Sequence, residues 1–274
     1  MKKKMLKRIA VITALVLMAG LLVFANALLG NPVSKALAKN AAKKYVETTY
    51  EDKDFYVEEV HYNFKDGEYI ALIKSPTSID SHFTIDISML GKVTLDRYAD
   101  VISGFNTATR LETEYREIVD QVLTSPSYPY DHYIGFGTLE VFGDVSADKN
   151  YPYEDPVYGL NVSDLVIDKI YDIRKLGSEV GHLVLYVEED DVSVERAGEI
   201  LLDITKHFDD AELPFKAISL VLQYKKPEEG MRPEGEIRLE QFSYEDIYEE
   251  GLLERITRAD EEIKAYYERL DAEK

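Results

Sequence analysis

The first 30 residues constrain this chain most strongly. Five Lys or Arg residues lie within the opening MKKKMLKR, and residues 9–30 (IAVITALVLMAGLLVFANALLG) carry no charged side chain. About 20 apolar residues span a bilayer as a helix, whereas the apolar core of a cleaved signal peptide is usually about 7–15 residues long. The length of the run therefore favours a retained transmembrane anchor that contacts the lipid bilayer through residues 9–30.

Two other interpretations of this segment stay open. The triplet Ala25-Asn26-Ala27 has the A-x-A pattern after which signal peptidases cut, and cleavage near Ala27 would give a secreted protein. A buried core helix is the other interpretation, and the flanking cations argue against it. Because basic flanks favour the cytoplasmic side, we expect a single-pass protein of the cell membrane, with its N-terminus cytoplasmic and residues 31–274 extracytoplasmic.

The chain beyond the anchor is strongly acidic and lacks cysteine. Setting aside the first eight residues leaves 27 Lys and Arg against 52 Asp and Glu, a net charge of −25. Nucleic-acid phosphates repel such a surface, so nucleic acid is excluded as a main partner. The absence of cysteine excludes disulfides, thiolate metal sites, cysteine nucleophiles and a lipoprotein-type lipid anchor.

Residues 31–125 are predicted to form an N-terminal α+β domain. Apolar residues recur every four positions after Asn31-Pro32, as they do on an amphipathic helix. Alternating apolar residues then predict three antiparallel strands, the first two joined by a hairpin turn at Asp66-Gly67. A long helix over residues 95–122, kinked near Gly104, completes the order helix, three-stranded sheet, helix.

A Tyr-, Pro- and Gly-rich connection is predicted at residues 126–160, and a second α+β domain at residues 161–274. Ser163-Asp164 is a capping signal for a helix that Gly177 would end. The apolar strand HLVLYVE, an amphipathic helix, the strands FKAISLVLQY and EIRLEQF and a last helix follow. This order of elements resembles most of a ferredoxin-like α/β sandwich.

Several stretches resemble the YfjL-like proteins of Gram-positive bacteria. They are NPVSKALAKNAAKKYVETTY after the anchor, GHLVLYVEEDDVSVERAGEILLDI, FKAISLVLQY and RPEGEIRLEQFSYEDIYEEGL. The resemblance spans nearly the whole chain and implies an N-terminal anchor followed by distinct N- and C-terminal domains. It implies no activity and supplies no functional residues.

The sequence predicts no catalytic site, no metal site and no cofactor. The five histidines lack H-E-x-x-H and H-x-H spacing, and the serine-nucleophile and phosphate-loop motifs are absent. The acidic run VEEDDVSVE lacks the spaced oxygen ligands of a calcium loop and fits the negative charge that a helix N-terminus favours. His61 and His82 would approach each other if the first and third strands were neighbours, and otherwise they lie on solvated faces.

Two similar motifs, YPYD at residues 128–131 and YPYE at residues 151–154, are the best candidates for ligand contact. Proline biases the preceding residue toward extended backbone, and a tyrosine ring stacks on a sugar or grips a peptide. The candidate ligand-binding residues are Tyr128, Tyr130, Tyr151 and Tyr153. The alternative for this segment is packing between two domains, with the rings buried.

These features predict a membrane-anchored extracytoplasmic protein that acts as a non-catalytic binding or interaction module of the cell envelope. An envelope protein or a cell-wall glycan is the expected partner. The alternative is a cell-wall-associated hydrolase, or a regulator of one, in which acids and tyrosines line a cleft. A purely structural envelope protein is a third interpretation that the sequence does not separate from the first.

Overall fold

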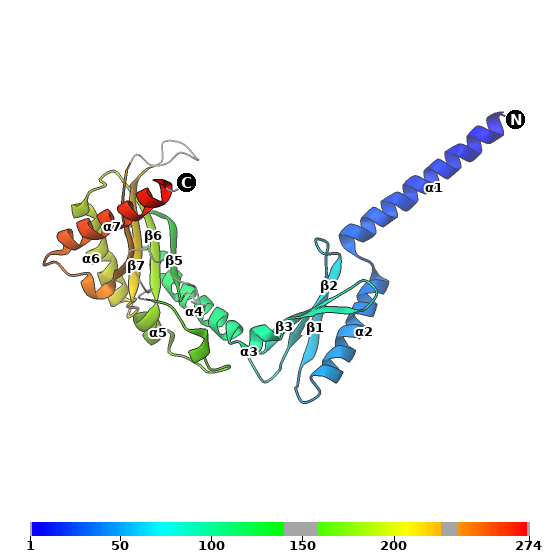
Figure 1. The fold of residues 1–274 in the computed structure, drawn as a ribbon, viewed down its shortest axis with the longest axis horizontal. Coiled ribbons are helices and arrows are strands. Elements are labelled where there is room, and N and C mark those ends of the chain that lie inside the picture. The colour runs from blue at the N-terminus through cyan, green and yellow to red at the C-terminus, as the bar shows by residue number, and fades with distance from the viewer. Residues whose placement is uncertain (1, 140–157, 226–234, 273–274) are drawn as a thin grey trace. The chain divides into compact units, whose positions relative to one another are not determined.

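The computed structural model describes residues 2–139, 158–225 and 235–272, which fold into two compact units. The division falls between Asn106 and Thr107, and each unit contains one four-stranded sheet (Figure 1). A long apolar N-terminal helix followed by two units of helices and strands confirms the predicted α+β class.

The first unit contains an antiparallel sheet in the order β1-β2-β3-β4. Its elements are α1 (Lys2–Leu29), α2 (Pro32–Thr49), β1 (Tyr56–Asn63), β2 (Glu68–Lys74), β3 (His82–Ile87), β4 (Val93–Asp96) and α3 (Ala99–Ile102). Helix α2 begins where the sequence predicts, because Pro32 suits the first helical position and the Asn31 side chain accepts a hydrogen bond from the Ser34 amide at 2.8 Å.

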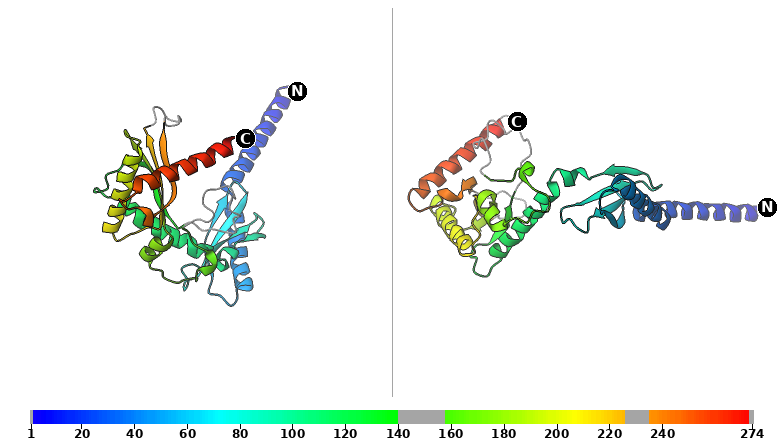
Figure 2. Two further views of the ribbon diagram at one scale, coloured as in Figure 1. Left: turned by 60° about the vertical axis from the view of Figure 1, so that its left-hand side comes forward. Right: turned by 90° about the horizontal axis from the view of Figure 1, so that it is seen from below.

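The core of the first unit lies between α2 and the sheet, since α2 contacts all four strands (Figures 1 and 2). Alternate residues of a strand share one face, so every second residue of β2 and β3 is buried here. The core residues are Ala38, Ala42, Val46, Val60, Tyr69, Ala71, Ile73, Phe83, Ile85, Ile87 and Val101.

The first sheet has one strand more than the three that the sequence predicts. Residues 93–96, which the sequence pattern assigns to the start of a helix, form β4 and pair with β3. A strand of four residues is too short to show a clear period of two, and Leu95 also fits the helical spacing that follows. The predicted break near Gly104 is confirmed, because this glycine has φ +81° and separates α3 from α4 (Phe105–Leu123).

The second unit contains a mixed sheet in the order β5-β6-β7-β8. Besides α4, its elements are β5 (His132–Thr138), η1 (Val162–Asp164), α5 (Ile173–Val180), β6 (His182–Glu189), α6 (Val194–Asp210), β7 (Ala217–Tyr224), β8 (Glu236–Ser243), η2 (Tyr244–Asp246) and α7 (Leu252–Ala272). The central strands β6 and β7 are parallel, and the two outer pairs are antiparallel.

The strand order differs from the split arrangement of a ferredoxin-like fold. Helix α6 connects β6 to β7, and these two strands are direct neighbours, whereas in a split β-α-β unit another strand lies between them. The sequential order of elements is the same in both arrangements. Strand order depends on long-range pairing, which local sequence patterns do not record.

Helix α4 packs into the second core, although the sequence analysis placed it in the N-terminal domain. Its residues Leu111, Tyr115 and Val119 are fully buried with side chains of β6 and α6. An amphipathic stripe shows that one face of a helix is covered, but not which sheet covers it. Many further apolar side chains of this core come from β6, β7, α6 and α7, among them Leu183, Leu185, Val187, Ile200, Leu201, Ile204, Leu220, Leu222, Leu252 and Ile256.

The helix predicted from Ser163 onward is much shorter than expected. Only the single turn η1 forms there, Asp168 has a positive φ of 62°, and α5 starts after Asp172, whose side chain accepts a hydrogen bond from the Lys175 amide at 3.2 Å. Gly177, predicted to end the helix, lies inside it instead. A Cβ atom at this position would lie 2.5 Å from the buried ring of Tyr115, so the glycine allows α4 and α5 to approach.

Candidate functional site

The first tyrosine-proline motif, residues 128–131, has both of its tyrosines packed within the second unit. Tyr128 is 9 % exposed, and its ring makes edge-to-face contacts with Tyr130, His132 and His207 at centroid distances of 5.7, 5.7 and 5.9 Å. Its hydroxyl is buried and has no hydrogen-bond partner among the described residues. The Tyr128 ring is therefore a part of the core rather than a surface offered to a ligand.

Tyr130 lies closer to the surface and is fixed by α6. Its hydroxyl donates a hydrogen bond to the Asp203 carboxylate at 2.9 Å, and the guanidinium of Arg196 lies 5.8 Å from its ring centroid. Burial, and then the hydrogen bond to Asp203, raise the pKa of Tyr130 above its usual value. The Tyr130 ring is half-buried, and its hydroxyl is occupied. Tyr151 and Tyr153, the corresponding candidates of the second motif, lie outside the described residues.

His207 joins the tyrosine-proline segment to α6. Its Nδ1 lies 2.9 Å from the Asp203 carbonyl oxygen, and its Nε2 lies 2.9 Å from the Ser127 carbonyl oxygen. A neutral imidazole has one N–H and donates to one of these acceptors, whereas the protonated ring donates to both. The bond to Asp203 raises the pKa of His207, partial burial opposes the increase, and the bond to Ser127 adds to it.

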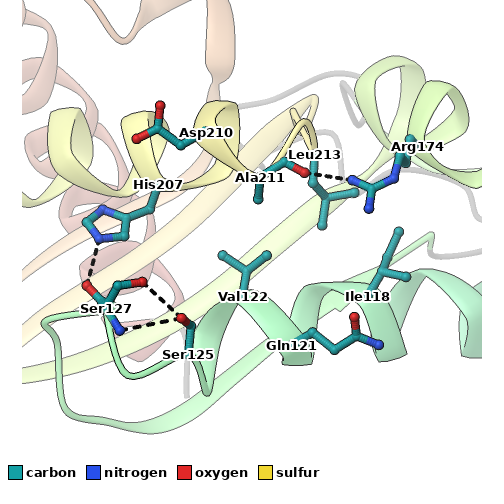
Figure 3. A pocket seen from close by; sticks show the side chains of 10 residues that line it. All are labelled: Ile118, Gln121, Val122, Ser125, Ser127, Arg174, His207, Asp210, Ala211 and Leu213. Carbon is teal, nitrogen blue, oxygen red and sulfur yellow. Dashed lines mark hydrogen bonds between the residues drawn. The ribbon is translucent and has the colours of Figure 1, made fainter.

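A cavity of about 430 Å³ opens beside this histidine, between α4, α5 and the end of α6 (Figure 3). Its apolar wall is formed by Ile118, Val122, Ala211 and Leu213, and its polar wall by Gln121, Ser125, Ser127, Arg174, His207 and Asp210. Arg174 and His207 lie at opposite ends of the view in Figure 3. An apolar wall combined with a few polar groups is the usual lining of a site for a small ligand.

The polar groups at both ends of the cavity hold backbone carbonyls. Arg174 Nη1 donates to the carbonyl oxygens of Ala211 at 2.7 Å and Glu212 at 3.0 Å, which satisfies the end of α6. His207 bonds the carbonyl of Ser127 at the other end (Figure 3). Both side chains thus shape the cavity by fixing the segments that border it.

Sequence reasoning missed His207 and Arg174. A basic residue in the last turn of a helix, such as His207, is a known signal for contact with the terminal carbonyls, but its ring contacts the carbonyls of Asp203 and Ser127 instead. Arg174 gives no comparable signal, because its partners follow 37 and 38 residues later in the chain.

The other polar candidates are separated or have structural partners. Strand β2 lies between β1 and β3, so His61 and His82 sit on strands that are not neighbours. In the acidic run before α6, Glu189 pairs with Arg196 at 2.7 Å, and Ser193 caps the helix by accepting from the Arg196 amide. Across residues 2–139, 158–225 and 235–272, no group of three or more His, Asp or Glu side chains is placed to hold a metal ion.

The end of α1 is bonded to the first sheet. The Tyr62 hydroxyl donates to the Ala27 carbonyl at 2.9 Å, and the Tyr69 hydroxyl donates to the Asn31 carbonyl at 2.8 Å while accepting from the Asn31 amide at 2.9 Å. Gly30 makes the turn between α1 and α2 with φ +67°. A Cβ atom there would lie 2.6 Å from the Tyr69 hydroxyl and 2.8 Å from the Tyr62 ring.

In the described part of the chain, one helix is long and apolar enough to cross a bilayer, and it lies at the N-terminus. Length and composition are what a transmembrane anchor and a signal sequence have in common. Contact of this helix with lipid is compatible with its exposed apolar side chains.

Replacing each tyrosine of the first motif by phenylalanine separates their roles. Tyr130→Phe removes the bond to Asp203 and is expected to lower the stability of the second unit by about 0.5–1.5 kcal/mol. Tyr128→Phe removes a buried hydroxyl without a partner, so stability is expected to stay the same or rise. Hydrogen exchange of the β6 and β7 amides in the full chain measures the change in stability for both variants. A larger loss from Tyr128→Phe than from Tyr130→Phe would contradict the packing described above.

The contribution of His207 to the stability of the second unit is expected to fall as pH rises above about 6.5, the usual histidine pKa. The folded state raises the pKa of His207, so its contribution is complete below the unfolded pKa and is lost as pH rises through the folded value. Burial lowers the pKa of His182 to about 4, so near pH 6.5 this ring gains a proton only in the unfolded state, and its effect on stability has the opposite sign to that of His207. The titrating ring is faced by the Asp203 carboxylate, 3.6 Å from Nδ1, and by the charge of Asp210.

The same exchange measurement, repeated between pH 6 and 8, tests this expectation. The stability difference between the wild type and His207→Gln isolates this contribution and should shrink as pH rises, whereas His61→Gln, at an exposed position of β1, should follow the wild type. An unchanged slope in His207→Gln would show that another group controls the pH dependence.

Comparison with known families covers most of the chain. Residues 2–97 match the YfjL-like N-terminal domain, and residues 114–257 match the YfjL-like C-terminal domain. No curated protein sequence and no solved structure gives a significant match. On the two domain matches, which follow one another in a single polypeptide, the chain belongs to the YfjL-like family.

Proposed function

We propose that this protein is a single-pass membrane protein whose residues 31–274 lie outside the cytoplasm and act as a non-catalytic binding module of the cell envelope. The observation that carries the proposal is the bonded junction between α1 and the first sheet. Tyr62 and Tyr69 hold Ala27 and Asn31, so the helix and the unit that follows form one folded piece. A segment destined for removal has no need of such contacts.

The junction favours retention of the helix over cleavage near Ala27. The triplet Ala25-Asn26-Ala27 lies inside α1, and its last carbonyl is held by Tyr62. The Asn26 side chain also accepts a hydrogen bond from the Asn31 side chain at 2.8 Å. A peptidase would have to unwind this turn and break both bonds to reach the peptide after Ala27.

The cavity beside His207 supports binding rather than proton transfer. A general acid or base needs a nitrogen or oxygen that is free to reach the substrate. Both nitrogens of His207 lie against backbone carbonyls, and the Tyr130 hydroxyl lies against Asp203. An envelope protein segment or a glycan that enters the cavity meets the apolar wall and the hydroxyls of Ser125 and Ser127.

The intact mass of the protein isolated from membranes tests retention. We expect the mass of a chain that includes residues 9–30. The variant Ala27→Phe, in which a bulky residue replaces the small one that signal peptidases require, should also have the mass of an uncleaved chain. A shorter wild-type chain that Ala27→Phe restores to full length would show cleavage. A reporter fused after Lys274 should be active outside the cytoplasm, and activity inside would reverse the proposed orientation.

Site-specific photo-crosslinking in the native membrane tests binding. A photo-reactive residue at Gln121, which lines the cavity and is exposed, should give discrete adducts. The matched control carries the same residue at the exposed position Arg258 of α7 and should give none of them. Equal patterns at both positions would argue against a site at the cavity. Hydrolysis of purified wall material by the full chain would overturn the non-catalytic part of the proposal.

A further inference from the structure

One end of the first sheet is built around the outer end of α1. Strand β1 ends at Asn63 and β2 begins at Glu68, so their hairpin turn lies at the same end as Tyr62 and Tyr69, which bond the α1–α2 junction. Tyr69 pairs with Ile87, the last residue of β3, so the turn between β3 and β4 lies at this end too. We call this end, with residues 63–67, residues 88–92 and the start of α2, the junction end.

The length of α1 determines at which depth of the bilayer the junction end would lie. At about 1.5 Å per residue, residues 9–29 extend roughly 31 Å, close to the ~30 Å of a bilayer hydrocarbon core. Leu29 therefore lies at the outer boundary of the hydrocarbon when α1 spans the membrane. The Tyr62 hydroxyl bonds Ala27, two residues before that boundary, so the β1–β2 hairpin reaches the same level. Tyrosine is enriched at this depth, because its ring is apolar and its hydroxyl is polar.

Large apolar side chains are exposed at the junction end. Phe64 in the first turn is 58 % exposed, and Leu90 in the second turn is 88 % exposed. Val33 and Leu37 of α2 are exposed at 70 % and 45 %, and Gly91 of the second turn lies against Leu37. These side chains come from three separate segments, and all of them lie at the junction end.

The charges of the first unit differ between its two ends. Exposed lysines accompany the apolar residues of the junction end, at positions 35, 65 and 92, and the exposed Asp66 there accepts a hydrogen bond from Asn63. The opposite end exposes Glu51, Asp52 and Asp54 together with a single lysine among them, Lys53, which pairs with Asp52 at 3.5 Å. Lysines next to apolar groups suit contact with lipid phosphates, and carboxylates are repelled by them.

We propose that the junction end is inserted into the headgroup region of the outer leaflet, with Phe64 and Leu90 as its membrane-contacting residues. The inference rests on the proposed function, because it requires α1 to span the bilayer. Lipid is the partner because the site is continuous with the lipid contact of α1, and because Tyr62 fixes its depth. The first unit then lies on the membrane at a fixed height rather than at the end of a free linker.

The absence of native cysteine allows single-cysteine labelling to test this contact. The full chain is reconstituted into phosphatidylcholine vesicles that carry nitroxide lipids, with a fluorophore at Phe64→Cys or Leu90→Cys. The control Ile79→Cys is 54 % exposed and follows β2 at the opposite end of the sheet. Leu17→Cys, in the middle of α1, reports whether the helix is in the bilayer.

We expect headgroup-level nitroxides to quench the labels at 64 and 90 at least about twofold more than the label at 79, because an interfacial side chain lies within roughly 5–10 Å of the headgroup boundary. Deep nitroxides should quench the label at 17. If the label at 17 is quenched while those at 64 and 90 behave like the label at 79, the inserted junction end is wrong and the anchor stands. If the label at 17 is not quenched, the anchor and the inserted end both fail.

Discussion

The two hydrogen bonds of the Tyr69 hydroxyl stabilise the first unit at the connection between α1 and α2. Helix α1 ends at Leu29 and α2 begins at Pro32, so the chain turns where both helices leave backbone groups without partners. Gly30 supplies the left-handed turn, and Tyr69 satisfies the amide and the carbonyl of Asn31. Because α2 supplies one side of the core, the position of this hydroxyl also fixes how the sheet is covered.

The second unit depends on close backbone approach rather than on a single polar contact. Gly137 and Gly177 both lie against the buried Tyr115 ring, where a Cβ would come within 3 Å of it. Helix α4 can therefore pack tightly against β5 and α5. The cavity remains where the packing of these helices ends, and His207 and Arg174 close its two ends by binding carbonyls. Tight packing and the candidate site are consequences of the same helix arrangement.

Local features of the fold were accessible from the sequence, and long-range features were not. The N-terminal helix, the Pro32 start of α2 and the Asp66-Gly67 hairpin each depend on neighbouring residues, and the structure contains all of them. The core that α4 joins and the adjacency of β6 and β7 depend on contacts between distant segments. The candidate site follows the same rule. Proline next to tyrosine drew attention to residues 128–131, but His207 reaches Ser127 across 80 residues of sequence, and no local pattern links them.

The short connection between α1 and α2 has a mechanical consequence. A helix whose apolar length differs from the local bilayer thickness tilts to reduce the mismatch. A flexible linker would isolate an attached domain from that tilt, but here one glycine, one asparagine and two tyrosine hydroxyls join the helix to the sheet. If α1 spans the bilayer as proposed, tilting it rotates the first sheet with it, so the orientation of this unit above the membrane depends on the thickness of the lipid.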